Sequence, residues 1–402
     1  MSTIVSKRMF AKRNVVIVGA KRTPVGIFMG GLANYTGPQL GVIATKGALT
    51  ASHLSPEDVE EVYLGNVNSA GSGQAPARQV TLGSGMRLDT PTTTVNKVCA
   101  SGMKTVMIGA TAIGAGERNI IVAGGFESMS KAPHYIYLRK PTGYGNSQAV
   151  DSIQFDTLTD VYSNTLMGAC TEKICSELGI TREAQDQYAI QSYMKARKAQ
   201  ESGIFDWEIV DVVEQEKGKE KRISKDEECQ KFFPDKFPGL KPAFAKNGTI
   251  TPANASKLND GACTIIIMAE ETAKERGLKP LARILGYEDA EVAPVDFGIA
   301  PSKAVGRLLQ KKGMTIKNID YHEVNEAFSA VALANAKLLD IDIDRINVHG
   351  GAVALGHPVG MSGARIILSL MNVLRTKNGT IGCASICNGG GGASSILIER
   401  LN

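Results

Sequence analysis

Short apolar runs that end in glycine alternate with helix-like segments along the first third of the chain. Residues 14–20 (NVVIVGA) are apolar and β-branched, as in a buried strand, and residues 39–51 have the apolar spacing of a helix. A strand pattern at 61–67, a helix pattern at 98–115 and a strand pattern at 119–123 follow. This alternation predicts an α/β unit in which crossover helices connect the strands of a parallel sheet.

The same alternation returns towards the C-terminus. The motif C-x-x-G-M that begins at Cys99 matches the motif H-x-x-G-M that begins at His357, and each opens a long apolar helix pattern. The glycine-ended strand pattern at 122–130 likewise parallels residues 385–395. We therefore predict two similar α/β halves that arose by duplication. Strand and helix patterns of the second half lie at residues 281–287, 302–312, 319–324, 326–339, 346–348, 361–375, 380–386 and 394–399.

Between the two halves the composition changes. Residues 182–201 form a charged helix pattern, and residues 214–231 are dense in Lys, Glu and Asp. We interpret this region as a loop domain on the surface of the first half that faces the substrate, and the apolar run 261–269 as the strand that completes that half. The predicted parts are a basic extension, the first half, the inserted loop domain, the completion of the first half and the second half, at residues 1–13, 14–129, 130–256, 257–280 and 281–402.

Length, charge and cysteine content limit the function. A chain of 402 residues exceeds what one hydrophobic core usually serves, and no run approaches the roughly 20 apolar residues that span a bilayer. The net charge of +5 is too small for a general nucleic-acid binder, but it suits anionic small molecules. The seven cysteines are odd in number and not densely spaced, so we expect free thiols in a reducing compartment. Neither the cysteines nor the five histidines have the spacing of a metal site.

The N-terminal residues suggest a subcellular location. Residues 1–13 contain four basic residues, and the first acidic residue of the chain is Glu57. A basic segment with Ser and Thr is typical of a mitochondrial transit segment, so we predict the mitochondrial matrix. A basic tail on a cytoplasmic protein is the alternative.

The two paired motifs hold a nucleophile and a base. Cys99 stands where a helix pattern begins, and the positive end of a helix dipole favours a thiolate. His357 lies between Gly356 and Pro358, which predicts a rigid turn, and imidazole is the usual base that activates a thiol. A buried structural cysteine and a hydrogen-bonded core histidine are the alternatives.

Two further motifs combine reactive or polar residues with unusual backbone. Cys387 closely precedes four consecutive glycines, which are costly in a strand unless backbone N–H groups must face an oxyanion or a ligand. A flexible turn is the alternative. Asn325 lies at a strand-to-helix junction, where it either caps the helix or holds a water molecule for catalysis.

These motifs together resemble those of the thiolase family. The segments NKVCASGMK, VNEAF, GGAVALGHPVGMSGAR and CNGGGG occur in the family's order, and the resemblance covers nearly the whole chain from about residue 14 onward. LTDVYSNTLMGAC, ANAS before LNDGA, and CNGGGGA are most similar to the short-chain acetoacetyl-CoA thiolase branch. The resemblance implies the thiolase fold, in which two similar α/β halves form a five-layered αβαβα core with an inserted loop domain. It also implies an acyltransferase that joins two acetyl-CoA molecules into acetoacetyl-CoA and CoA through an acetyl-cysteine, and reverses the reaction on short 3-ketoacyl-CoA.

The resemblance assigns a role to each motif residue. Cys99 is the nucleophile that becomes acylated, and His357 takes its proton. Cys387 removes the α-proton of the second acetyl-CoA. Asn325 holds a water that forms one oxyanion hole together with His357, and the backbone N–H groups of Cys99 and Gly389 form the other.

The resemblance also implies ligands and assembly. Coenzyme A thioesters are the substrates, no cofactor is covalently bound, and the chain forms a homotetramer, a dimer of dimers. The coenzyme A contacts correspond to Leu158, Met167, Lys231, Phe244, Ala255, Ser256 and Phe328. Some members of this branch bind a potassium ion through one phenol oxygen and backbone carbonyls, which correspond to Tyr193, Pro252, Ala253, Ala255 and Val353.

Of three other functions, the reactive residues distinguish the first two from this one. A carrier-protein-dependent ketoacyl synthase would have histidine at the position of Cys387, and a non-catalytic relative would lack Cys99, His357 or Cys387. A broader-chain thiolase of fatty-acid β-oxidation keeps all three. The chain departs from the family pattern at Leu166, where many relatives have histidine, and at Pro252, where a small residue is usual. Tolerance of 2-methyl-branched substrates stays open.

Overall fold

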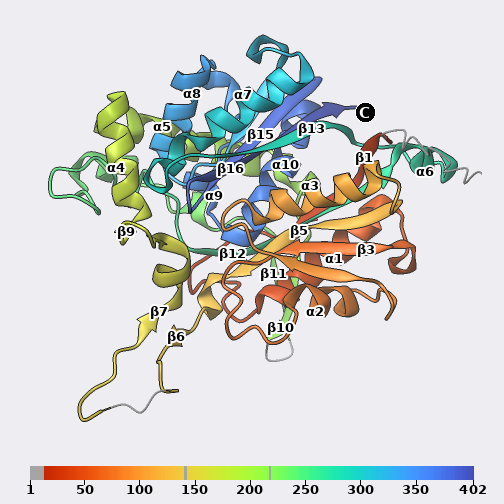
Figure 1. Ribbon diagram of the computed structural model, residues 1–402, viewed down its shortest axis with the longest axis horizontal. Coiled ribbons are helices and arrows are strands. Elements are labelled where there is room, and N and C mark those ends of the chain that lie inside the picture. Colours follow the sequence, from red (N-terminus) through yellow and green to blue (C-terminus); the bar gives the residue numbers. More distant parts are fainter. Residues whose placement is uncertain (1–12, 140–142, 217–218) are drawn as a thin grey trace, which may run out of the picture.

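The computed structural model describes residues 13–139, 143–216 and 219–402. The predicted basic extension therefore lies outside the described residues, apart from Arg13. The strands of both halves follow one hydrogen-bonded path, in the order β14-β15-β16-β13-β1-β12-β5-β3-β4 (Figure 1).

The first half contributes one end of this path. Its strands are β1 (Val15–Arg22), β2 (Gly26–Ile27), β3 (Glu61–Gly65), β4 (Thr92–Val95), β5 (Ile120–Ser128) and β12 (Asn259–Ala269). Its helices are α1 (Gly37–Ser52), α2 (Pro76–Gly83), α3 (Ser101–Gly114) and α6 (Glu270–Glu275). Helix α1 begins with a capping box, in which the Thr36 side chain accepts from the backbone of Gln39 while the Gln39 side chain accepts from the backbone of Thr36.

The second half contributes the other end. Its strands are β13 (Ala282–Glu291), β14 (Tyr321–Val324), β15 (Ile381–Asn388) and β16 (Gly392–Arg400). Its helices are α7 (Ala300–Lys312), α8 (Ser329–Leu339), α9 (Ala352–Leu355) and α10 (Val359–Thr376). The two halves join where the start of β1 pairs with the start of β13, with Val15 opposite Ile284.

Buried side chains form five layers. Helices α1 and α2 cover one outer face of the sheet, and α7 covers the outer face of the other half with α8 beside it. Helices α3 and α10 lie in the centre, where their side chains pack between both halves of the sheet. Nearly every residue of α10 is buried, including the polar residues Ser362, Arg365 and Asn372. This is the predicted αβαβα arrangement.

The sheet is mixed, so the prediction of a parallel sheet holds for only some of its strand pairs. Strand β3 is parallel to β4 and β5, and β14 is parallel to β15, but the other pairs within the two halves are antiparallel. The cause is visible at the C-terminus, where a turn of only a few glycines joins β15 to β16 and allows no crossover helix. Residues 346–348 are also not a strand, since only Ile346 forms an isolated bridge, with His322.

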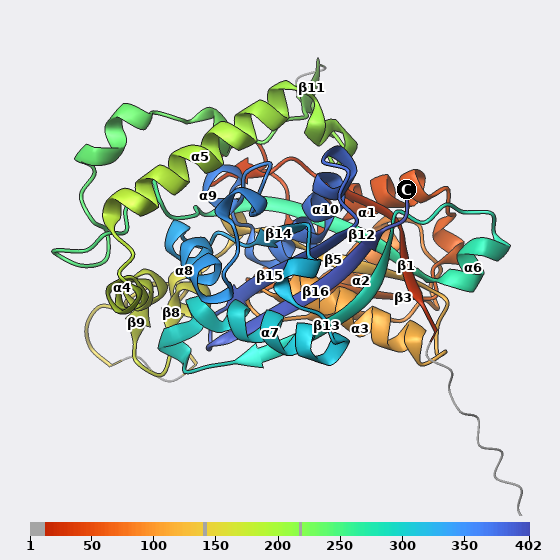
Figure 2. The same cartoon turned by 90° about the horizontal axis from the view of Figure 1, so that it is seen from above.

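The inserted region contains two long helices and several short hairpins. Its elements are β6 (His134–Tyr135), β7 (Val150–Asp151), β8 (Thr159–Asp160), β9 (Thr165–Leu166), α4 (Met167–Leu178), α5 (Arg182–Glu201), β10 (Val212–Glu216) and β11 (Lys219–Ile223). Helix α4 packs against α8, and α5 packs against α8 and α9, so the insertion covers the second half as well as the first. Figure 2 shows α5 lying across this face of the molecule. Among the described residues, no helix is both long and apolar enough to cross a membrane.

Candidate active site

Cys99 lies on a tight turn between β4 and α3. The preceding residue, Val98, has a φ of 46°, in the left-handed region that β-branched residues rarely adopt. The Ser101 side chain stabilises the turn, because its Oγ accepts from the Lys97 backbone at 2.8 Å and donates to the Val98 carbonyl at 2.6 Å. The strained turn presents Cys99 two residues before the first residue of α3, half-buried at the edge of a cavity.

His357 lies between α9 and α10, and its hydrogen bonds determine its tautomer. Its Nδ1 is 2.6 Å from Ser362 Oγ, and Ser362 donates its own hydrogen to the Pro358 carbonyl at 2.9 Å. Ser362 must therefore accept from Nδ1–H, which leaves Nε2 without a proton. Nε2 is buried, and within the described part of the chain it has no hydrogen-bond partner. Burial, and then the charge of Arg365, lower the pKa of His357 to about 3, so the imidazole is a neutral base at pH 7.

Glycines allow the nucleophile and the base to meet. A Cβ atom on Gly102 of α3 would lie 2.8 Å from the Ala364 nitrogen, and one on Gly363 of α10 would lie 2.3 Å from the Met103 nitrogen. The backbones of α3 and α10 therefore touch where the two helices cross, near their N-termini. Cys99, just before α3, and His357, just before α10, both line the cavity beside this crossing.

A buried carboxylate that sequence reasoning missed fixes the same region. Glu127, at the end of β5, accepts hydrogen bonds from the Asn66 side chain and from the backbone of Val67, Asn68 and Gly360, at 2.8–3.1 Å. Burial raises its pKa to about 7, against the effect of these donors. The sequence FESMS holds no sign of this role, because the partners come from loops far along the chain.

The end of β15 completes the wall. Cys387 is buried near Cys99, close enough for the two sulfurs to interact electrostatically. Gly389 lines the cavity, and its backbone hydrogen bond acts on the Cys99 sulfur. The next two residues, Gly390 and Gly391, have φ values of 86° and 90°, which only glycine adopts readily, and they turn the chain into β16. The glycine run therefore both turns the chain and directs an N–H group at the nucleophile.

The protonation of Cys99 differs from the prediction. The start of a helix was expected to favour its thiolate, but burial raises its pKa to about 11, and the backbone hydrogen bond from Gly389 offsets only part of that rise. Burial, and then Cys99, raise the pKa of Cys387 still further above its usual range. At rest, the site therefore contains two thiols and one neutral imidazole.

Asn325 does not cap the following helix. The cap residue of α8 is Phe328, which has no side-chain capping bond, so the capping alternative is wrong. The Asn325 Oδ1 accepts from Arg365 at 3.3 Å, whereas its Nδ2 is buried without a partner in the structure. Such an unpaired donor is costly unless another polar molecule meets it.

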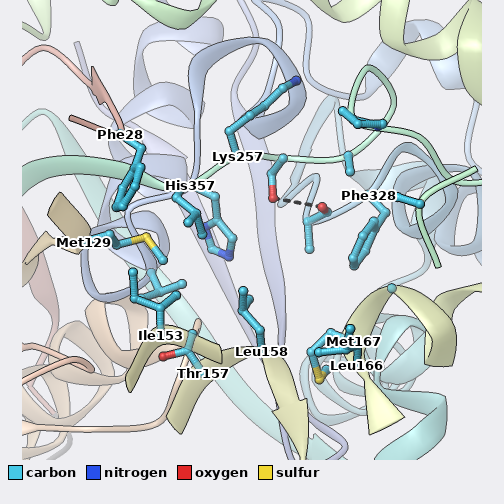
Figure 3. Close-up of a pocket in the computed structure, with 18 of the residues that line it drawn as sticks. Phe28, Met129, Ile153, Thr157, Leu158, Leu166, Met167, Lys257, Phe328 and His357 are labelled. Carbon is cyan, nitrogen blue, oxygen red and sulfur yellow. Dashed lines mark hydrogen bonds between the residues drawn. The ribbon is translucent and has the colours of Figure 1, made fainter. Parts of the chain in front are cut away.

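A cavity of about 740 Å³ opens in front of these residues. Cys99, His357 and Gly389 line it, and so do all the positions predicted to contact coenzyme A: Leu158, Met167, Lys231, Phe244, Ala255, Ser256 and Phe328. Figure 3 shows His357 facing Leu158 across the cavity, with Met167 and Phe328 further along it. Sequence reasoning missed four further lining residues: Phe28 after β2, Met129 after β5, and Ile153 and Thr157 in one short helical segment. Its volume is that of a site for a small-molecule ligand.

Comparison with known proteins identifies the family. Residues 15–271 match the N-terminal domain of thiolase and residues 278–400 match its C-terminal domain. The chain belongs to the thiolase family. It is 49% identical to a probable acetyl-CoA acetyltransferase of Dictyostelium discoideum, over 98% of this chain and 97% of the relative. It is 50% identical to the mitochondrial acetyl-CoA acetyltransferase of Rattus norvegicus, over 96% of this chain and 91% of the relative.

Solved thiolase structures share the fold. The Acat5 thiolase of Ascaris suum, in complex with coenzyme A, superposes with a TM-score of 0.92 at 44% identity, covering 97% of this chain and all of that one. The acetyl-CoA acetyltransferase of Bacillus anthracis superposes with a TM-score of 0.94 at 39% identity, with the same coverage. The thiolase fold and the acyltransferase class predicted from the motifs are confirmed.

The predicted potassium ligands of this thiolase do not fit a potassium ion as they stand. The ammonium group of Lys257 donates to the phenol oxygen of Tyr193 at 2.7 Å and to the carbonyl oxygen of Val353 at 2.9 Å. Two predicted ligand atoms therefore already bind a cation of the chain itself. The remaining predicted ligands, Pro252, Ala253 and Ala255, lie in the segment just before Lys257.

Proposed function

We propose that this chain is an acetyl-CoA C-acetyltransferase, which condenses two acetyl-CoA molecules to acetoacetyl-CoA and CoA and catalyses the reverse thiolysis. The observation that carries the proposal is the wall on which a thiol, a neutral imidazole and a backbone N–H group border one cavity. Relatives about half identical over nearly their whole length are named acetyl-CoA acetyltransferases, from mitochondria in rat and from the cytosol in Gibberella zeae.

In the first half-reaction, Nε2 of His357 takes the proton of the Cys99 thiol as the sulfur attacks the acetyl carbonyl. The backbone N–H groups of Cys99 and Gly389 stabilise the oxyanion. CoA leaves with the proton from His357, and the acetyl group stays on Cys99. The free Nε2 and the Gly389 hydrogen bond at Cys99 support these assignments.

In the second half-reaction, Cys387 gives its proton to His357 and, as a thiolate, takes the α-proton of the second acetyl-CoA. The resulting carbanion attacks the acetyl carbonyl on Cys99, and the departing Cys99 sulfur recovers a proton from His357. A raised thiol pKa makes the Cys387 thiolate a strong base, which a weakly acidic carbon acid requires. The unpaired Nδ2 of Asn325 supports its proposed role in holding a water for the other oxyanion hole.

Separate assays of the two half-reactions test these roles. Cys99→Ala should abolish acetyl transfer from radiolabelled acetyl-CoA to the protein. Cys387→Ala should still become acetylated, but should neither condense nor exchange the α-protons of acetyl-CoA with deuterium oxide, because only enolate formation needs that base. Cys383→Ala is the matched control, since Cys383 is also buried on β15 but packs with side chains of α7, whereas Cys387 interacts with Cys99. Loss of acetylation in a folded Cys387→Ala protein would show that the roles are wrong.

Chain-length preference tests the alternative of a broader thiolase. A human mitochondrial 3-ketoacyl-CoA thiolase shares the fold at 37% identity, close to the 39% of the Bacillus anthracis acetyl-CoA acetyltransferase, so the fold alone does not separate the two. We expect faster CoA-dependent cleavage of acetoacetyl-CoA than of 3-ketohexadecanoyl-CoA. Cleavage of 2-methylacetoacetyl-CoA measures branch tolerance. A preference for the long chain would overturn the short-chain assignment.

We also propose a mitochondrial location and a tetramer. The basic segment 1–13 supports the location, and the cytoplasm is the alternative, since relatives occur in both compartments. Exposed apolar side chains after β6, at Ile136, Tyr137 and Leu138, support a contact between subunits. Imaging of a C-terminal fluorescent fusion tests the location, and light scattering after gel filtration tests the assembly.

A further inference from the structure

The ammonium group of Lys257 binds two oxygen atoms that were predicted to bind potassium. Lys257 lies between Ser256 and β12, and like Ser256 it lines the cavity. Its ammonium group bridges the Tyr193 phenol oxygen on α5 and the Val353 carbonyl oxygen on α9. Figure 3 shows that its side chain extends away from His357, so it does not point at the reacting atoms.

An aromatic ring, two oxygen acceptors and two carboxylates surround the ammonium group. The ammonium nitrogen is 5.0 Å from the centre of the Tyr193 ring, a cation–π distance. Burial lowers the pKa of Lys257 to about 8, and the carboxylates of Glu228 and Glu326 offset part of that fall by favouring the charged form. Glu326 is itself buried and accepts from the backbone of Val353 at 3.0 Å. A bound monovalent cation would meet the same oxygens and the same carboxylates.

A second cation at this position would meet repulsion from the first. Any ion that used the Tyr193 and Val353 oxygens would lie against the ammonium group, inside the protein where charges are poorly screened. It would also have to displace two charge-assisted hydrogen bonds. Potassium binding and the observed position of Lys257 therefore exclude one another.

We propose that the Lys257 ammonium group takes the place of a bound potassium ion. A cation of the chain itself then holds the residues that line the coenzyme A cavity in position, and this thiolase works without potassium. The bridge joins α5 and α9 to the segment that carries Ala255 and Ser256, which line the cavity. The effect on coenzyme A rests on the proposed function, whereas the exclusion of the ion does not.

The contact between Lys257 and Tyr193 also affects a second part of the cavity lining, around Lys231. The Tyr193 ring stacks on Phe232, with ring centres 5.2 Å apart and an interplanar angle of 10°, and it meets Phe237 edge-on at 6.2 Å. Phe232 adjoins Lys231, which lines the cavity. A fixed Tyr193 thus positions the segment whose lysine faces the ligand.

The wild-type protein provides the first test. Thallium(I) resembles potassium in size and charge and can be located in crystals by its anomalous scattering. We expect no thallium between Tyr193 and Val353, and an unchanged melting temperature and Kd for CoA when choline chloride replaces potassium chloride at equal ionic strength. Thallium at this position, or a Kd that weakens about tenfold without potassium, would overturn the proposal.

The variant Lys257→Ser provides the second test, because it removes the ammonium and leaves room for an ion. We expect its Kd for CoA to weaken about tenfold in choline chloride and to recover in potassium chloride, with thallium now bound between Tyr193 and Val353. Lys246→Ser, at an exposed lysine of the inserted region, is the matched control and should respond to neither salt. A Lys257→Ser protein that binds CoA like wild type in both salts would show that the Lys257 contacts do not position the coenzyme A site.

The two proposals fail in different ways. If the wild-type protein bound no CoA in either salt, the proposed function would be wrong, but the thallium experiment would still decide whether Lys257 excludes the ion. If the Lys257→Ser protein does not fold in either salt, the wild-type thallium and melting experiments decide the matter alone.

Discussion

At the residue scale, the identity of the reactive groups could be predicted, but their protonation could not. The motifs around Cys99 and His357 are local, so one sequence reveals them. The pKa values of about 11 and about 3 depend on burial by elements from both halves of the chain. A helix N-terminus is visible in sequence, whereas the desolvation that outweighs it is a property of the fold. The result is a neutral thiol–imidazole pair rather than a resting ion pair.

Ser362→Ala tests the tautomer of His357. In wild type, the lowered pKa of His357 keeps the base form populated above about pH 3, so nitrogen-15 NMR should show a neutral ring with hydrogen on Nδ1 from pH 5.5 to 8. The variant should lose the single tautomer and, on the order of tenfold to a hundredfold, the acetylation rate. Ser369→Ala, another buried serine of α10, is the control. A wild-type His357 that gains a proton near pH 6.5 would contradict the assignment.

At the element scale, the order of strands and helices followed from hydrophobic patterns, but strand direction did not. A run such as 380–386 looks the same in a parallel or an antiparallel pair. Only the glycine turn before β16 decides the direction. The helix predicted at 98–115 begins at Ser101 instead, and that shift matters because it leaves Cys99 on the strained turn. The crossing of α3 and α10 was not predictable, because nothing local shows which glycines meet.

Gly363→Ala tests that crossing. Its Cβ would lie 2.3 Å from a backbone nitrogen of α3, so the helices must move apart and separate Cys99 from His357. We expect about a hundredfold loss of kcat, as for a misplacement of about 1 Å, and a lower melting temperature. Gly306→Ala is the matched control, because a Cβ in the middle of α7 meets nothing within 4 Å. Helix propensity should make that control slightly more stable. Equal activity of the two variants would show that the crossing does not position the site.

At the scale of the whole molecule, the insertion binds both halves through buried charges. Arg22 on β1 donates to Glu208 at 2.7 Å and to Asp226 at 2.7 and 2.9 Å, and all three side chains are buried. Glu208 also accepts from Asn372 of α10 at 2.7 Å. The partners lie 186 and 204 positions from Arg22 in the chain, so no sequence pattern could pair them. The cluster explains why the insertion is not confined to the surface of the first half.

Arg22→Met therefore tests how the insertion is held. The variant keeps the volume of the side chain but leaves two carboxylates buried without their cation, which costs about 3–5 kcal/mol. We expect urea unfolding to shift to a lower midpoint. Activity should fall with it, because the 251–258 segment lines the cavity and is joined to α5 by the Lys257–Tyr193 hydrogen bond. Adding Glu208→Gln and Asp226→Asn should recover part of the loss, since neutral amides tolerate burial better than unpaired carboxylates. Arg222→Met, which breaks an exposed pair with Asp211, should leave the midpoint unchanged. If Arg22→Met unfolded at the wild-type midpoint, the buried cluster would not be what fastens the insertion to the two halves.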